Sequence, residues 1–197
     1  MSRQALVLVS ALFCTAATLL AADTVGVPGS NNRFETSIES KINGKKVKLN
    51  LTGTAMRKRL FFNVYAVGSY LEEGKKARTP EELASLDVAK QLHLIMERDV
   101  AGKDVADSFR SAIRANYPEP EFNSEMDALS DYLSSQAIKQ GDHVWLTNVP
   151  GVGLDVILVG KTERLIKNPK FAKAVWDIYF GPNNLGPDVK RGLSSRL

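Results

Sequence analysis

The chain has 197 residues, of which 26 are basic and 22 acidic, so its formal net charge is +4. This small excess is spread along the sequence and does not form the concentrated basic patch, with stacking aromatic residues, that is typical of nucleic-acid-binding proteins. The single cysteine, Cys14, lies in an N-terminal apolar run. The sequence beyond that run therefore has no thiol for a disulfide, a redox centre or a thiolate metal site.

The first 22 residues have the pattern of a cleavable signal peptide. Arg3 supplies a positive charge, residues 5–20 are apolar without a charged side chain, and Ala21-Ala22 offer small residues for cleavage before Asp23. The apolar run is shorter than the about 20 residues that a membrane span needs, and no later segment reaches that length. We therefore expect export, to the periplasm, with no membrane span in the mature chain; an uncleaved anchor is the alternative.

The remaining chain has the length of one domain. Residues 23–33 are rich in Gly, Pro, Ser and Asn and are predicted to form a flexible lead-in, followed by a domain over residues 34–197. Apolar and polar residues alternate on either side of Asn43-Gly44. This pattern predicts an amphipathic β-hairpin, because both positions of such a tight turn require a positive φ.

Residues 56–71 form a long aromatic and β-branched stretch, which predicts either two strands or one bent strand. Gly68 within it indicates a bulge or the close approach of another chain segment. The apolar side chains of this stretch are expected mostly in the core, with some along a ligand cleft if one exists; they include Phe61, Phe62, Val64 and Val67.

The middle of the sequence changes from strand to helix periodicity. Thr79-Pro80 predict the start of a short helix, because Pro is favoured at the first helical position. Residues 92–96 predict another strand. Apolar residues then recur with helical spacing over residues 105–116 and again over 126–138, which predicts two longer helices.

The C-terminal part returns to strands before it ends in helices. Strands are predicted over residues 144–149, 154–159 and 162–166. Asn168-Pro169 begin a third long helix, and a last helical turn follows Pro187. Because the strands come as antiparallel hairpins and the helices are grouped, the predicted fold class is α+β, an antiparallel β-sheet with a helical layer on one face.

The sequence lacks the common motifs of covalent, metal and cofactor chemistry. His93 and His143 fall in predicted strands, and their spacing fits no metal-ligand motif. Gly151 and Gly153 lack the third glycine and the following helix of a dinucleotide-binding turn. No serine lies in a Gly-x-Ser-x-Gly elbow. We therefore expect no cofactor and no bound metal.

One ordered set of segments is similar to a known family. Residues 53–57 (GTAMR) and 64–70 (VYAVGSY) resemble the Gly-x-Gly-x-Arg and Val-Tyr-Ala-x-Gly-x-Tyr segments of the chalcone isomerase-like family, with Ala55 at the second family glycine. Agreement continues in the same order over residues 98–100, 153–160 and 171–181. The resemblance spans roughly residues 34–193 and rests on the ordered set of segments, because no single one of them is specific.

The resemblance implies an open-faced sandwich whose ligand cleft lies between a large antiparallel sheet and a layer of helices. In the plant isomerases an arginine of this motif polarises the substrate, and tyrosine, lysine and asparagine side chains on the following helix complete the site with a threonine on the strand. In the fatty-acid-binding relatives the arginine pairs with a tyrosine that anchors a carboxylate.

Carried onto this sequence, the arginine is Arg57 and the strand threonine is replaced by Tyr65. The helical tyrosine, lysine and asparagine of the isomerases fall near Val105, Ser108 and Ala112. No tyrosine or lysine occurs over residues 105–116, so a small alignment shift does not restore the catalytic set. The resemblance thus implies that the binding half of the site is present and that the catalytic half is not.

Three functions remain open from the sequence. The first is an exported, non-catalytic binder of an apolar carboxylate, such as a fatty acid, with Arg57 and Tyr65 as ligand-binding residues. The second is an isomerase or intramolecular lyase of altered chemistry. The third is a structural or partner-binding module whose cleft is filled by its own side chains, in which case Arg57 lies on a solvent-facing strand and Tyr65 in the core.

Overall fold

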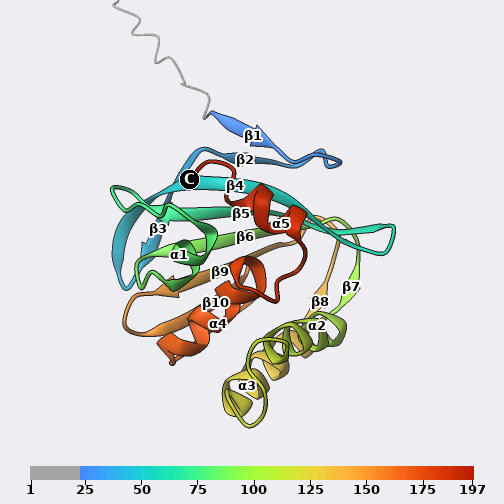
Figure 1. The fold of residues 1–197 in the computed structure, drawn as a ribbon. Coiled ribbons are helices and arrows are strands. Elements are labelled where there is room, and N and C mark those ends of the chain that lie inside the picture. The colour runs from blue at the N-terminus through green and yellow to red at the C-terminus, as the bar shows by residue number, and fades with distance from the viewer. Residues whose placement is uncertain (1–22) are drawn as a thin grey trace, which may run out of the picture.

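The computed structural model describes residues 23–197, and the predicted signal peptide, residues 1–22, lies outside the described residues. A curled antiparallel sheet forms the body of the molecule (Figure 1), in the order β11-β10-β9-β6-β5-β4-β3. Its strands are β3 (Ser37–Ile42), β4 (Lys45–Arg59), β5 (Phe62–Glu72), β6 (Lys90–Met96), β9 (His143–Val149), β10 (Gly153–Leu158) and β11 (Glu163–Ile166).

The helices pack on one face of this sheet, so the predicted α+β class is confirmed. They are α1 (Pro80–Ser85), α2 (Gly102–Arg114), α3 (Asn123–Ser134), α4 (Pro169–Phe180) and α5 (Pro187–Leu193). Helix α4 lies across β9 and β10, and its Trp176 is fully buried. Alternate strand residues such as Val67, Leu94 and Leu146 point toward the helices and join them in one hydrophobic core.

Two hairpins shape the edge of the sheet where the site residues lie. The β3–β4 turn is at Asn43-Gly44, with φ of 50° and 76°, as the sequence predicted. Residues 56–71 form two strands rather than one bent strand, because a second tight turn at Leu60-Phe61 separates β4 from β5.

The opposite face of the sheet is covered near β4 and β5 by a small second sheet. Strand β1 (Thr24–Gly26) pairs with β2 (Arg33–Glu35), although residues 23–33 were predicted to form a flexible lead-in. The difference arises because Val27 is buried together with Phe34 in a second apolar cluster. The close approach expected at Gly68 is confirmed, since a Cβ there would lie 2.7 Å from the Phe34 ring.

The exposure of one aromatic residue differs from the expectation. Phe61 was expected in the core or along a cleft, but it is 96% exposed because it lies at the tip of the β4–β5 hairpin, and the neighbouring Phe62 is 61% exposed. Val67 is in the core as expected, and Trp176 is buried there as well, whereas Trp145 is half-buried. No helix within residues 23–197 combines the length and apolar character that crossing a bilayer requires.

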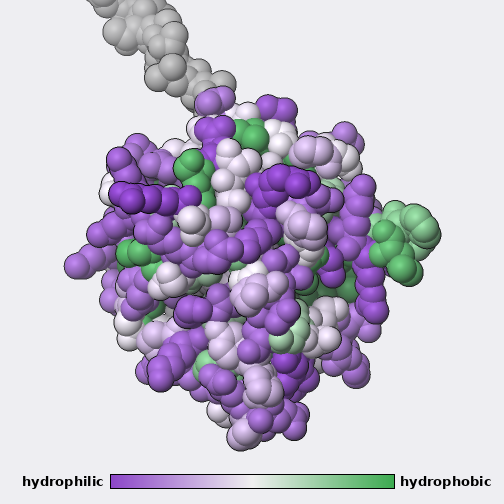
Figure 2. All heavy atoms as spheres, viewed as in Figure 1, coloured by the Kyte–Doolittle hydropathy of each residue, from purple (hydrophilic) through white to green (hydrophobic). Residues whose placement is uncertain are grey.

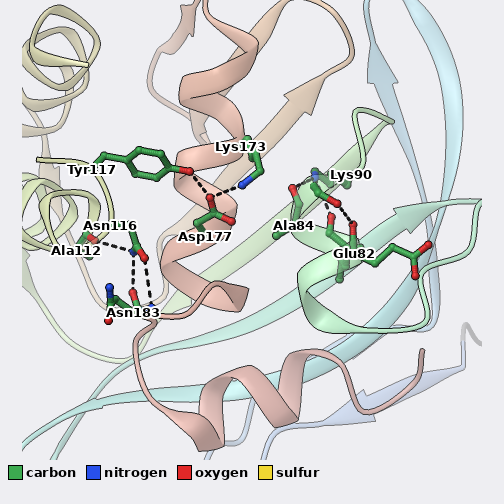
Figure 3. A network of polar contacts seen from close by, with 11 residues as sticks. Glu82, Ala84, Lys90, Ala112, Asn116, Tyr117, Lys173, Asp177 and Asn183 are labelled. Carbon is green, nitrogen blue, oxygen red and sulfur yellow. Dashed lines mark hydrogen bonds and ion pairs between the residues drawn. The ribbon is translucent and has the colours of Figure 1, made fainter. Parts of the chain in front are cut away.

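Polar contacts connect the segment after α2 to helix α4 (Figure 3). Tyr117, after α2, donates a hydrogen bond to the Asp177 carboxylate on α4, and Lys173 donates a second one over 2.6 Å. This arrangement gives the buried Asp177 both a neutral and a charged donor. It therefore satisfies a carboxylate that would otherwise be costly to remove from water.

Lys90 is a buried cation beneath the helices. Its ammonium donates to the carbonyl oxygens of Leu83 and Ala84 at 2.9 and 2.7 Å, and it lies 5.1 Å from the Trp176 ring centroid. These contacts place a positive charge at the C-terminal end of α1, where the helix dipole favours it. Burial nevertheless lowers the pKa of Lys90 to about 7.

This shift predicts a pH dependence of stability. The unfolded chain keeps the lysine proton up to about pH 10.5, whereas the folded protein releases it above about pH 7, so the unfolding free energy should rise with pH between these values. The rise should reach at most about 4 kcal/mol by pH 10. Urea unfolding of wild type and Lys90→Met at pH 7, 8.5 and 10 measures it. Lys41→Met, on the exposed side of β3, is the control; parallel curves for wild type and Lys90→Met would contradict the shift.

Candidate functional site

A cavity of about 260 Å³ lies between the sheet and the helical layer. Strands β4, β5, β6 and β9 form one wall, and helices α2, α3 and α4 form the other. Its interior is largely apolar and includes Leu94, Met96, Phe109, Leu133, Leu146 and Ile178. Such a concave apolar space with a few polar groups is the usual form of a small-molecule site.

Arg57 and Tyr65 both line this cavity and are half-buried. They share a face because they are direct partners across the β4–β5 ladder. A register shift between Arg57 and Lys58 adds one residue to β5 there. The structure thus brings the two predicted site residues together by cross-strand pairing.

The guanidinium of Arg57 is held by the backbone rather than by an acid. Its Nη1 donates to the Leu185 carbonyl oxygen over 2.9 Å. Within residues 23–197 Arg57 takes part in no ion pair. The remaining donors of its planar fork are therefore free for an anionic ligand, for which paired N–H groups are well suited.

Tyr179 on α4 completes a polar cluster that sequence reasoning missed. The Tyr65 and Tyr179 hydroxyl oxygens are 3.2 Å apart, within hydrogen-bond distance. Burial raises the pKa of Tyr65 despite the hydrogen bond and the nearby Arg57, and burial likewise raises the pKa of Tyr179 well above its usual value. Both hydroxyls are neutral, so one donates to the other and the second proton remains available to a ligand.

The loop after α4 holds the Leu185 carbonyl in place. The Asn116 side chain at the end of α2 donates to the Asn183 carbonyl oxygen over 2.8 Å (Figure 3). The Asn183 side chain in turn donates to the Ala115 carbonyl oxygen over 2.8 Å. This reciprocal pair ties the loop to α2. It thereby fixes the acceptor that orients Arg57.

Helix α2 supplies the wall opposite the strands. Val105, Ser108 and Ala112, the positions that correspond to the catalytic side chains of the plant isomerases, all line the cavity. The helix begins at Gly102, where a Cβ would lie 1.9 Å from the Leu133 carbonyl oxygen, so α2 starts directly against the end of α3. The positions carried over from the resemblance are therefore at the cavity, and they present a methyl-bearing or hydroxyl side chain there.

Charged side chains surround the opening of the cavity. Arg59, Arg98 and Asp104 line it and are exposed. Arg98 and Asp104 lie outside the β4–β5 hairpin, and sequence reasoning did not connect them to Arg57. The balance of charge at the opening is positive, which favours an anionic group over a cationic one.

The two histidines lie together but away from this cavity. His93 on β6 and His143 on β9 are in strands, as predicted, with His93 Nε2 2.8 Å from His143 Nδ1. His93 also stacks on Trp145, and burial lowers the pKa of His93 to about 3. Across residues 23–197 no group of three or more His, Cys, Asp or Glu side chains is arranged to hold a metal ion.

The comparisons with known proteins give one family and one fold. A family model described as chalcone isomerase-like matches residues 32–193. A crystal structure of a fatty-acid binding protein from Arabidopsis thaliana superposes with a TM-score of 0.66 over 88% of this chain and 96% of that chain, at 16% sequence identity. At this identity the likeness is one of fold. No curated protein sequence matches the chain.

Proposed function

Because the chain belongs to the chalcone isomerase-like family, we propose that it is an exported, non-catalytic protein that binds an apolar carboxylate such as a fatty acid. The observation that carries the proposal is Arg57, a half-buried cation beside an apolar cavity and without an acidic partner among residues 23–197. A carboxylate would bind the free edge of its guanidinium and accept a further hydrogen bond from the Tyr65–Tyr179 pair.

The size of the cavity supports an aliphatic chain as the ligand. Its volume of about 260 Å³ is just below the range of about 300–1,000 Å³ that is usual for drug-sized ligands. The space therefore suits a single alkyl chain better than a bulky polycyclic molecule. The name of the plant structural neighbour, a fatty-acid binding protein, agrees with this ligand class by analogy of fold.

The two other functions have less support. An isomerase needs fixed polar groups directed at the charge that develops in the transition state, and α2 presents Val105, Ser108 and Ala112 at the cavity. A purely structural module would fill its cleft with its own side chains. The open volume next to Arg57 instead favours a ligand-binding role.

Replacing Arg57 should separate binding from folding. Arg57→Leu removes hydrogen bonds between a charged donor and the carboxylate, which typically contribute about 1.5–3 kcal/mol, so the Kd for a medium-chain fatty acid should rise roughly ten- to more than a hundred-fold. Tyr65→Phe removes one neutral hydrogen bond, about 0.5–1.5 kcal/mol. Because Arg57 is half exposed, the unfolding free energy should change by no more than about 1 kcal/mol.

Calorimetric titration of delipidated protein with fatty acids of graded length measures these values. Arg164→Leu, an exposed arginine on β11 outside the cavity lining, is the matched control and should bind like wild type. Equal fatty-acid affinity of wild type and Arg57→Leu would show that Arg57 does not bind the carboxylate. An absence of fatty-acid binding by wild type would contradict the proposed function.

Chalcone cyclisation should not be accelerated. Loss of one transition-state donor typically lowers the rate about 10²–10³-fold, and the cavity has apolar or hydroxyl side chains at three positions of the isomerase set. An absorbance assay with hydroxylated chalcones tests this expectation against the spontaneous rate. Turnover well above that rate in wild type, and lost in Arg57→Leu, would instead identify an isomerase.

Export remains a proposal from residues 1–22, with their single Arg3, apolar run and Ala21-Ala22. We expect the protein recovered from the periplasm to begin near Asp23. Intact-mass measurement of the periplasmic fraction shows where the chain begins. A protein confined to the cytoplasm that still starts at Met1 would contradict export.

A further inference from the structure

The tip of the β4–β5 hairpin is an exposed apolar projection. Leu60, Phe61 and Phe62 are 85%, 96% and 61% exposed and are consecutive in the chain. In Figure 2 a hydrophobic protrusion stands out at the right-hand edge of the molecule, where Figure 1 places the end of this hairpin. A contiguous apolar group of this kind, clear of the body of the protein, usually marks an interaction site.

The turn itself places a leucine where the backbone conformation disfavours one. Leu60 adopts the left-handed region with a φ of 56°, where a side chain other than Gly, Asn or Asp is uncommon. The β3–β4 turn of the same chain meets a similar demand with Asn43-Gly44, the residues preferred in such turns. Leu60 therefore contributes apolar surface at a cost to the backbone.

A basic collar surrounds this apolar tip. Lys58, Arg59 and Arg98 are exposed, and the Arg98 guanidinium lies 5.5 Å from the centroid of the Phe62 ring. Asp99, next to Arg98, is paired with Lys139, and Asp104 is the acidic side chain at the nearby opening. An apolar tip with cationic side chains behind it is complementary to an anionic bilayer, with acyl chains below and lipid phosphates at the surface.

The tip also forms part of the cavity opening. Leu60 and Phe62 line the cavity together with Arg59 and Arg98. The register shift next to Arg57 allows both Phe62 and Tyr65 to face this side, although an odd spacing of three would separate them on a regular strand. A bilayer that receives the tip would therefore lie at the opening.

We propose that the β4–β5 hairpin tip docks the protein onto the surface of an anionic lipid bilayer. Leu60 and Phe61 enter the interfacial region, while Lys58, Arg59 and Arg98 contact lipid phosphates. The proposal of membrane docking depends only on the exposed hairpin tip and the basic residues around it. The consequence that an amphiphile passes directly between bilayer and cavity rests on the proposed function.

Flotation with vesicles measures the docking. Wild type should bind vesicles of phosphatidylcholine with one quarter phosphatidylglycerol at least ten-fold more tightly than vesicles of phosphatidylcholine alone. In the double variant Leu60→Asn, Phe61→Ser, Asn suits the positive φ of position 60 and both apolar side chains are removed, so the protein should keep or raise its melting temperature and bind at least ten-fold more weakly. Val159→Ser, at an apolar position 50% exposed elsewhere on the surface, should bind like wild type.

A tryptophan at the tip reports insertion directly. The emission of Phe61→Trp should shift to shorter wavelength on addition of the anionic vesicles and be quenched by lipids with brominated acyl chains. An unshifted emission, or equal flotation of wild type and the double variant, would overturn the proposal. Loss of self-association in the double variant by light scattering, without vesicle binding by wild type, would overturn it in favour of a contact between two copies. Fatty-acid titration without vesicles tests the proposed function separately.

Discussion

The pairing of β4 with β5 decides where each candidate functional group lies. Their ladder runs from Leu49 opposite Glu72 to Arg59 opposite Phe62, with two register shifts along it. The shift next to Arg57 lets Arg57, Tyr65 and Phe62 face the same side of the sheet. Because a slip of one residue exchanges the two faces of a strand, loss of this irregularity would direct part of the set away from the cavity. The placement of Arg57 beside Tyr65 and the orientation of Phe62 toward the cavity are thus consequences of one local backbone feature.

Local features of the fold were predictable, and non-local ones were not. Asn43-Gly44 specifies its turn through backbone geometry, and Gly68 indicates a close approach whose partner, Phe34, is 34 positions away and could not be named. Strand β1 exists because β2 pairs with it, which its own composition does not reveal. Phe61 was expected in the core or along a cleft because apolar character predicts burial on average, whereas its exposure follows from its place at the end of a hairpin.

In the candidate site, too, local features were predictable from the sequence and contacts between distant segments were not. Arg57 and Tyr65 were identified through the resemblance of their segments to a family, and the structure explains their proximity by cross-strand pairing. Tyr179 is 114 positions from Tyr65 in the chain and was assigned only to a helix. The Leu185 carbonyl, which orients Arg57, is a backbone atom and carries no residue-type signal at all. A second-layer contact such as Asn116 with Asn183 is equally invisible before the fold is known.

The two walls of the cavity differ in how tightly they are coupled to the rest of the molecule. The strand wall shares its residues with the ladder and with the main core, so a change there disturbs pairing as well as the site. The α2 wall contributes Val105, Ser108 and Ala112 from one helical face, and Val105 and Ala112 are only partly buried while Ser108 is exposed. Substitutions on that face alter the chemistry of the cavity while leaving the sheet intact. The chemistry of this cavity is therefore set in part by three positions on a single helix, which can be exchanged without changing the pairing of any strand.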